Sequence, residues 1–189
     1  HCALGDTYHA LGFHEQAAEE FVRAGLDPQT ELRLLNAEQL LDSAQVQFYL
    51  GNHQNSLQLY QRALEGHPDP PAYVYFNLAY LHTLLGDTLQ AEENLSTAER
   101  IDPREARVPH LWGLICENRG EWEQALGHFR YALERKPSFH VARAHAALMC
   151  LRLGDKQEAG KLIEPLVGKI ITEPELSELV TEIARQVGY

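Results

Sequence analysis

Histidine is the residue type in this chain that most invites a chemical role, since its ten imidazoles could bind metal ions or transfer protons. Their spacing does not support a metal site. The glutamate after His14 begins a zinc-binding pattern, but Ala18 stands where that pattern requires a second histidine. His140 and His145 are five residues apart, so on a helix their side chains would diverge. We therefore predict no metal site, and we expect His82 to occupy a core position.

Motifs for other kinds of catalysis are missing from the sequence as well. It contains no phosphate-binding glycine loop, no dinucleotide-binding glycine motif and no nucleophile elbow, and its carboxylates are spread as on a helical surface. We predict that the chain is not an enzyme and needs no cofactor.

Small and large residues instead recur with a period close to 34 residues. A glycine marks each period, at spacings of 39, 35, 34, 34 and 34: Gly12, Gly51, Gly86, Gly120, Gly154 and Gly188. In each complete period a small residue stands seven before the glycine and a large one nine after it, as with Gly113 and Phe129. Two helices approach closely only where the side chains at their crossing are small. The pattern therefore predicts one helical hairpin per period, and the hairpins must stack to bury their apolar faces.

This pattern resembles the tetratricopeptide repeat family, whose repeat has the same length. The resemblance covers nearly the whole chain and implies an all-α fold, a right-handed α-solenoid of stacked antiparallel helical hairpins. It predicts a single domain over residues 1–189, with repeats at about 1–36 (truncated, with an insertion), 37–71, 72–105, 106–139 and 140–173, and a capping helix or half repeat at 174–189. Because the chain starts at His1 inside the first repeat, we expect it to be a piece of a longer protein.

Local signals predict several element boundaries. Asp87 and Asp155 should cap helices by accepting backbone hydrogen bonds from the residues three positions later. Pro174 should begin a final helix that ends near Val187, with its apolar residues on one stripe. Residues 29–50 contain helix-forming side chains without a breaker, which predicts an unusually long helix.

Two of the three cysteines, Cys116 and Cys150, hold the same position in neighbouring repeats. Equivalent points of stacked repeats lie about 10 Å apart, which is beyond the reach of a disulfide. We predict buried free thiols, which favours a reducing, cytoplasmic compartment.

The charge of the chain is unevenly distributed. The net charge is -11, and residues 1–105 contain 16 acidic and 5 basic side chains, against 11 of each in residues 106–189. A phosphate backbone requires a basic surface, so the composition argues against nucleic-acid binding. No apolar run approaches the roughly 18 residues that span a bilayer, so we predict no membrane segment. The acidic part instead favours a partner with basic segments.

The family resemblance implies that the first helix of each repeat lines a concave peptide-binding groove. Its predicted positions are Glu38, Leu41, Gln45, Phe48, Tyr49, Tyr73, Phe76, Tyr80, Arg107, His110 and Leu114. The helix at 72–85 has two apolar stripes where a hairpin needs one, and Tyr73, Phe76 and Tyr80 belong to the second stripe. Either neighbouring helices or a bound ligand would cover that stripe.

These observations predict a protein-interaction scaffold that binds a peptide or helix with apolar and basic side chains. The family's clamp for acidic chaperone tails is not expected, because residues 1–135 contain no lysine. Two alternatives remain open at this point. The chain could be the regulatory or substrate-recruiting arm of a larger enzyme, or its repeats could stack end to end into homo-oligomers.

Overall fold

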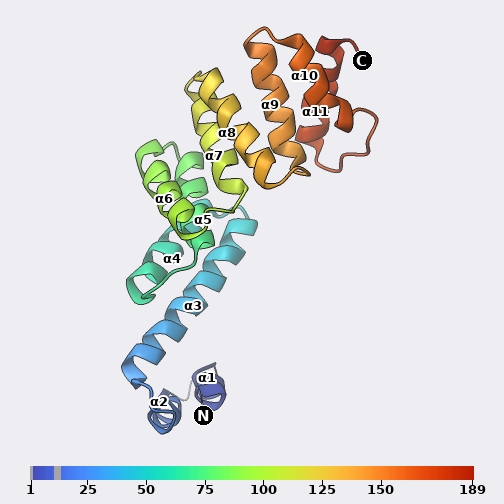
Figure 1. Ribbon diagram of the computed structural model, residues 1–189. Helices are drawn as coiled ribbons and strands as arrows, with labels where there is room; N and C mark the ends of the chain where they lie inside the picture. The colour runs from blue at the N-terminus through green and yellow to red at the C-terminus, as the bar shows by residue number, and fades with distance from the viewer. Residues whose placement is uncertain (1, 11–13) are drawn as a thin grey trace. The chain divides into compact units, whose positions relative to one another are not determined.

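The computed structural model describes residues 2–10 and 14–189, and within them all side chains except those of residues 2, 9–10, 14–15 and 28–35. This part of the chain contains helices and no strand (Figure 1). The helices are α1 (Cys2–Ala10), α2 (His14–Arg23), α3 (Pro28–Tyr49), α4 (His53–Gly66), α5 (Ala72–Leu84), α6 (Thr88–Ile101), α7 (Arg107–Asn118), α8 (Trp122–Arg135), α9 (His140–Arg152), α10 (Lys156–Ile163), the 3₁₀ helix η1 (Glu164–Leu166) and α11 (Pro174–Val187). The predicted all-α class is confirmed.

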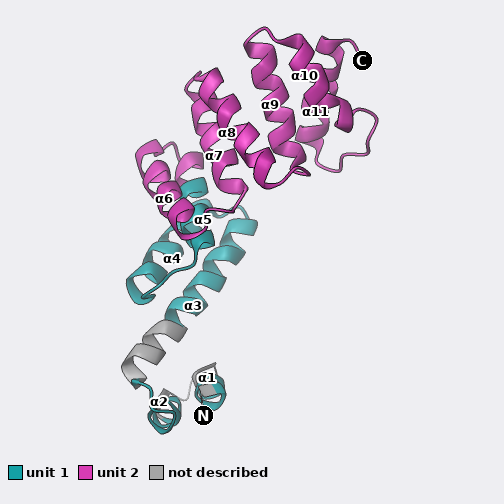
Figure 2. Ribbon diagram, viewed as in Figure 1, with its two compact units in different colours: residues 1–81 teal, residues 82–189 magenta. Residues whose placement is uncertain are grey.

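The chain divides into two compact units, His1–Leu81 and His82–Tyr189, and the boundary falls within α5 (Figure 2). Unit 1 has a core built from α3, α4 and the first part of α5, with Tyr60 and Val74 fully buried. Unit 2 has its own core, which extends from α7 to α11 and includes Phe129, Met149 and Ile183. The single solenoid over residues 1–189 stays a prediction.

The predicted close helix crossings are present in both units. A Cβ atom added to Gly113 in α7 would lie 2.5 Å from the ring of Phe129 in α8, closer than any real Cβ contact. The same addition at Gly5 in α1 would lie 2.5 Å from the ring of Phe21 in α2. Each glycine therefore provides the space that the phenylalanine of the second helix fills.

Turns and caps follow the sequence pattern closely. Gly120 and Gly154, at the turns of two hairpins, have φ values of 77° and 85°, which favour glycine over other residues; Gly12 lies outside the described residues. Asp87 accepts a hydrogen bond from the backbone nitrogen of Gln90, and Asp155 accepts one from that of Glu158. The side chain of Gln90 bonds Glu93 instead of reaching back to the cap.

The long first helix of the second repeat is confirmed: α3 contains 22 residues, and it begins at Pro28 rather than Gln29. The sequence also predicts that Leu32 and Leu35 extend this helix at its N-terminus; their side chains are not among those that the structure describes. At the other end of the chain, α11 begins at Pro174 and buries Leu176, Val180 and Ile183, as predicted.

Three smaller predictions about buried residues are also confirmed. His82 is 7% exposed and is therefore buried, as expected. Cys116 and Cys150 are buried free thiols, and burial raises the pKa of both. Separately, none of the helices in the described ranges is both long and apolar enough to cross a bilayer.

Candidate functional site

One stripe of α3 forms the polar half of the candidate surface. Glu38, Asp42, Gln45 and Tyr49 are four, three and four residues apart, so they lie on one face of the helix. Glu38 and Asp42 are exposed and Gln45 is half-buried. Tyr49 is 77% exposed, which is unusual for an aromatic ring of this size.

Leu41 does not belong to this stripe. Its side chain is 4% exposed and packs in the core of unit 1 with Ala44 and Leu57. Spacing alone would also put Leu41 beside Glu38 and Gln45, but its burial leaves almost none of its surface accessible to a ligand. We therefore leave Leu41 out of the candidate surface.

Aromatic side chains of α5 form the apolar half. Tyr73, Phe76 and Tyr80 are all half-buried. The ring of Tyr80 lies 5.5 Å from that of Phe48 in α3, centroid to centroid, at an interplanar angle of 60°. Both Phe48 and Tyr73 also pack against the core of unit 1. Neighbouring helices thus cover part of the second apolar stripe of α5 and leave part of each ring accessible.

The contacts between α3 and α5 show that the two helices run in the same direction. Phe48, near the end of α3, contacts Tyr80, near the end of α5. About two turns before these two residues, Tyr73 of α5 lies within electrostatic range of Asp42 and Glu38 of α3. Burial raises the pKa of the Tyr73 hydroxyl, and the two carboxylates raise it further. The surface therefore has an acidic end (Glu38, Asp42, Tyr73) and an aromatic end (Phe48, Tyr49, Tyr80).

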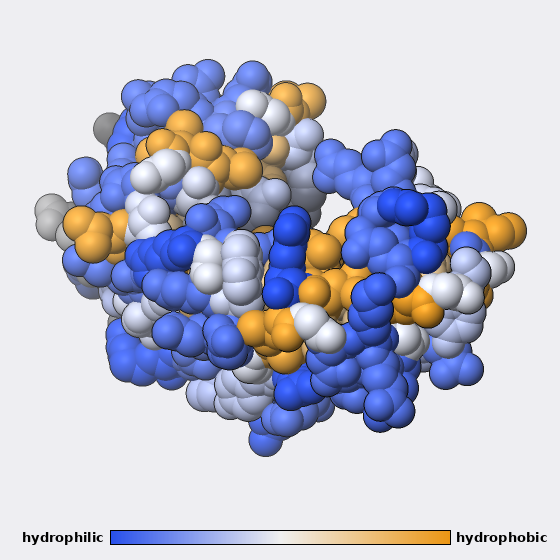
Figure 3. Space-filling view, turned by 90° about the horizontal axis from the view of Figure 1, so that it is seen from above, coloured by the Kyte–Doolittle hydropathy of each residue, from blue (hydrophilic) through white to orange (hydrophobic). Residues whose placement is uncertain are grey.

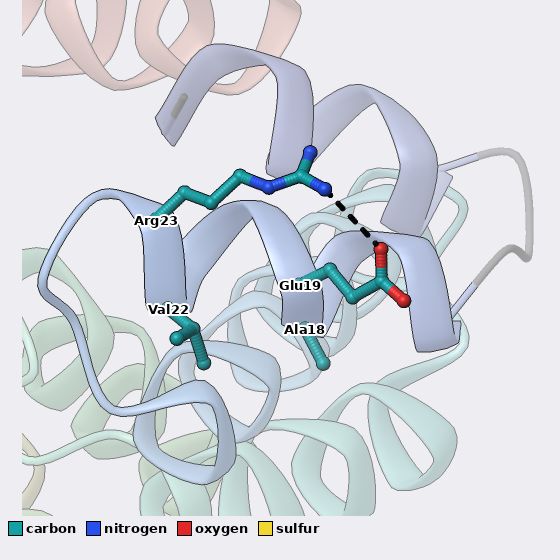
Figure 4. A pocket seen from close by; sticks show the side chains of 4 residues that line it. All are labelled: Ala18, Glu19, Val22 and Arg23. Carbon is teal, nitrogen blue, oxygen red and sulfur yellow. Dashed lines mark ion pairs between the residues drawn. The ribbon is translucent and has the colours of Figure 1, made fainter.

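The carboxylates of the acidic end are available for binding. Among the side chains that the structure describes, none forms an ion pair or a hydrogen bond with Glu38 or Asp42. Elsewhere in unit 1 the charged groups of α2 pair with each other, as Arg23 does with Glu19 at 3.6 Å. That pair lines a hollow along α2 together with Ala18 and Val22 (Figure 4). Because its charges are already paired, this hollow is the weaker candidate.

A buried hydrogen bond holds α5 in place beneath the candidate surface. The side-chain amide of Asn77 donates to the hydroxyl of Tyr60 in α4, with 2.8 Å between nitrogen and oxygen. Asn77 is 8% exposed and Tyr60 is fully buried, and burial raises the pKa of Tyr60. Sequence reasoning missed Asn77, although an amide between Tyr73 and Tyr80 in an apolar helix was a visible signal. This bond ties α5 to α4.

The other three predicted groove residues belong to unit 2. Arg107 is exposed and pairs with Glu105 at 2.8 Å, and hydrogen bonds from Arg107 hold the pKa of Glu105 below its usual value. Leu114 is half-buried and packs against the core of the unit. These two side chains are therefore engaged within their own unit.

His110 lies in an aromatic pocket of unit 2. Its ring centroid is 5.6 Å from that of Phe129, 4.9 Å from that of Phe139 and 5.7 Å from that of His145. Its Nε2 atom is buried without a hydrogen-bond partner in the described part of the chain. Burial lowers the pKa of His110 to about 4, with a further contribution from His145. At neutral pH this histidine is uncharged and fills space in the unit.

A metal site near these positions would require several titratable side chains close together. The described ranges, residues 2–10 and 14–189, contain no group of three or more histidine, cysteine or acidic side chains that could hold a metal ion. Nδ1 of His145 lies 2.9 Å from a carboxylate oxygen of Glu117, so these two side chains are hydrogen-bonded to each other. On the face seen in Figure 3, apolar side chains form several patches separated by polar ones.

Comparison with family models gives matches to the tetratricopeptide repeat over residues 41–106 and 112–168. A search of curated proteins by sequence gives no match. Solved structures of tetratricopeptide repeat proteins share the fold, at sequence identities that support the fold alone.

Three of these structures illustrate the range of TM-score, sequence identity and coverage. YrrB, a TPR protein described as having an unusual peptide-binding site, has a TM-score of 0.62 at 14% identity, with 96% of this chain and 90% of that one covered. MamA from Desulfovibrio magneticus RS-1 has a TM-score of 0.62 at 16% identity, with 99% and 94% covered. The first TPR of Spaghetti (RPAP3), bound to the HSP90 peptide SRMEEVD, has a TM-score of 0.57 at 17% identity, with 63% and 94% covered.

Proposed function

Because the chain belongs to the tetratricopeptide repeat family, we propose that it is a protein-interaction module whose α3–α5 surface binds a peptide or helix of a partner protein. Members of this family are generally non-catalytic scaffolds. The observation that supports this surface is Tyr49, a ring 77% exposed to solvent beside the contact of Phe48 with Tyr80. Aromatic side chains are favoured as the anchors of protein interfaces.

The charge of unit 1 supports a partner with both basic and apolar side chains. Residues 1–81 contain 10 acidic and 3 basic side chains. Glu38 and Asp42 stand unpaired beside the aromatic rings, among the described side chains. Such a surface attracts cationic segments and repels acidic ones. The acidic peptide in the Spaghetti structure is therefore a poor chemical match for this surface.

A pull-down with matched variants tests the proposal. The test variant combines Tyr49→Ser, Glu38→Gln and Asp42→Asn. The control variant combines Tyr189→Ser, Glu175→Gln and Glu178→Gln, which makes the same kinds of change at exposed positions of unit 2. Circular dichroism first shows that both variants remain helical. Mass spectrometry then identifies the proteins that the natural chain retains from a lysate.

We expect at least one protein to bind the natural chain and the control variant and to be lost from the test variant. Purified partner fragments would then narrow the bound segment. Retention of the same proteins by all three chains would place binding elsewhere and contradict the proposal for this surface.

A further inference from the structure

We infer that the partner segment is an α-helix that presents a lysine or arginine and a large apolar side chain seven residues apart. This inference rests on the proposed function and adds the conformation and spacing of the bound segment. It follows from the distance between the acidic end and the aromatic end of the α3–α5 surface.

The two ends are separated by seven residues on each helix. On α3 the step runs from Asp42 to Tyr49, and on α5 it runs from Tyr73 to Tyr80. Seven residues of α-helix rise by about 10 Å and complete nearly two turns, so both ends of each step face the same way. The surface thus repeats one spacing on two helices that run in the same direction.

The acidic end suits a single cationic side chain. Glu38 and Asp42 are both exposed, and among the described side chains neither has a partner. They lie close enough to Tyr73 to raise the pKa of its hydroxyl, so the half-buried ring is part of the same environment. A guanidinium or ammonium group there would gain two carboxylates and could also contact an aromatic face.

The aromatic end suits an apolar side chain. Phe48 lies between two other rings, with centroid distances of 5.5 Å to Tyr80 and 5.8 Å to Tyr49. The ring of Tyr49 meets that of Phe48 edge-on, at 85°. A leucine or aromatic side chain packed here would cover ring surface that unit 1 itself leaves in solvent.

The spacing distinguishes a helix from an extended peptide. In an extended chain, side chains on one face recur every second residue, at about 7 Å and then about 13 Å. Neither distance matches the separation of about 10 Å between the two ends. In an α-helix, residues seven apart lie on one face at about that separation. A partner helix laid along α3 and α5 would keep both contacts together.

A displayed library of 18-residue helices built on alanine and glutamine, with one face randomised, tests this inference. The bait is the whole chain, and the selected helices are then measured against three variants. Tyr49→Ser alters the aromatic end, and the pair Glu38→Gln and Asp42→Asn alters the acidic end. The pair Glu175→Gln and Glu178→Gln in α11 is the matched control.

We expect helices that depend on Tyr49 to carry lysine or arginine seven residues from a large apolar side chain. Their affinity should fall about tenfold or more on the acidic-end variant and stay unchanged on the control. Moving the basic residue to an offset of five, which turns it to another face of the helix, should lower the affinity by the same factor.

Two results would overturn the inference. If the selected helices depend on Tyr49 but show no preferred offset and no effect of Glu38 and Asp42, the spacing is wrong and the proposed function stands. If no selected helix depends on Tyr49, the α3–α5 surface does not bind helices of this kind. The pull-down then decides the proposed function separately, through its own control variant.

Discussion

The α3–α5 surface of unit 1 and the His110 pocket of unit 2 are two aromatic clusters built on the first helices of repeats, yet they end in opposite states. In unit 2 the chain completes the cluster itself, because Phe139 from the connector and His145 from α9 close around His110. In unit 1 the cluster stays open, with Tyr49 77% exposed. Beside the closed cluster, Glu117 has a partner within the unit, since its carboxylate lies 2.9 Å from Nδ1 of His145. The same repeat framework therefore provides either a cluster that the chain covers itself or one that it leaves exposed.

The largest expected effect on stability comes from the Gly113–Phe129 crossing, which borders the closed cluster. Gly113→Leu would force a side chain into the ring of Phe129, which lines the His110 pocket. We expect it to lower the free energy of unfolding by roughly 3 kcal/mol or more, because overpacking a close helix crossing displaces both helices. Urea unfolding followed by circular dichroism measures the loss.

Gly127→Ala is the matched control for that experiment. Gly127 lies in α8, and a Cβ atom added there meets nothing within 4 Å. This substitution should raise the free energy of unfolding by up to about 1 kcal/mol through helix propensity. Equal losses at both positions would contradict the role assigned to the crossing.

The next largest effect is the pH dependence of the folding stability that His110 in the closed cluster causes. Burial lowers the pKa of His110 to about 4 in the folded chain, whereas an unfolded histidine titrates near 6.5. Between these values the unfolded chain binds more protons, so stability falls as pH decreases through this window and the penalty is complete below about 4. The loss should approach about 3 kcal/mol.

Comparing the natural chain with His110→Phe isolates this contribution. The variant should lose less stability than the natural chain between pH 6.5 and 4, measured by urea unfolding at each pH. His145, Glu117 and the other titrating groups remain in both chains. Parallel pH profiles would show that His110 is not responsible.

A smaller effect is expected where α5 is fixed beneath the open surface. Asn77→Ala would leave the buried hydroxyl of Tyr60 without its partner, at a cost of about 1–3 kcal/mol. Adding Tyr60→Phe should recover part of that loss, since the second change removes the unsatisfied hydroxyl. Thermal and urea unfolding of the two single variants and the double variant measure this coupling. Additive losses would argue against the hydrogen bond.

The smallest effect should come from the open surface itself. Tyr49→Ser changes a ring that is mostly in solvent, so the free energy of unfolding should change by less than about 0.5 kcal/mol. Its effect should show in binding instead. A loss well above 1 kcal/mol in urea unfolding would mean that Tyr49 serves packing, and the contrast between the two clusters would disappear.

Local spacing predicted the framework of the fold. The pairing of Gly113 with Phe129, the cap at Asp155 and the start of α11 at Pro174 all depend on residues close in sequence. The burial of Leu41 depends on which way α3 turns toward α4, and the family pattern did not specify it.

Contacts between elements were less predictable. The closure of His110 by Phe139 depends on a connector side chain, and the bond of Asn77 with Tyr60 joins two helices of different hairpins. In the candidate site, the sequence predicted most of the residues of the α3–α5 surface as members of a longer groove. It did not predict that the surface would have an acidic end and an aromatic end.

The Gly5–Phe21 and Gly113–Phe129 crossings also constrain how such a sequence can change. A side chain larger than hydrogen cannot enter either glycine position while the opposing ring is in place. The hairpin of α9 and α10 has Ala147 and Ile163 at the equivalent positions, both fully buried. The hairpin of α3 and α4 has Ala44 and Tyr60 there, so an aromatic ring tolerates alanine only where the ring and the helix are placed differently. At the Gly5–Phe21 and Gly113–Phe129 crossings, a redesign that enlarges the glycine must therefore also change the ring that faces it.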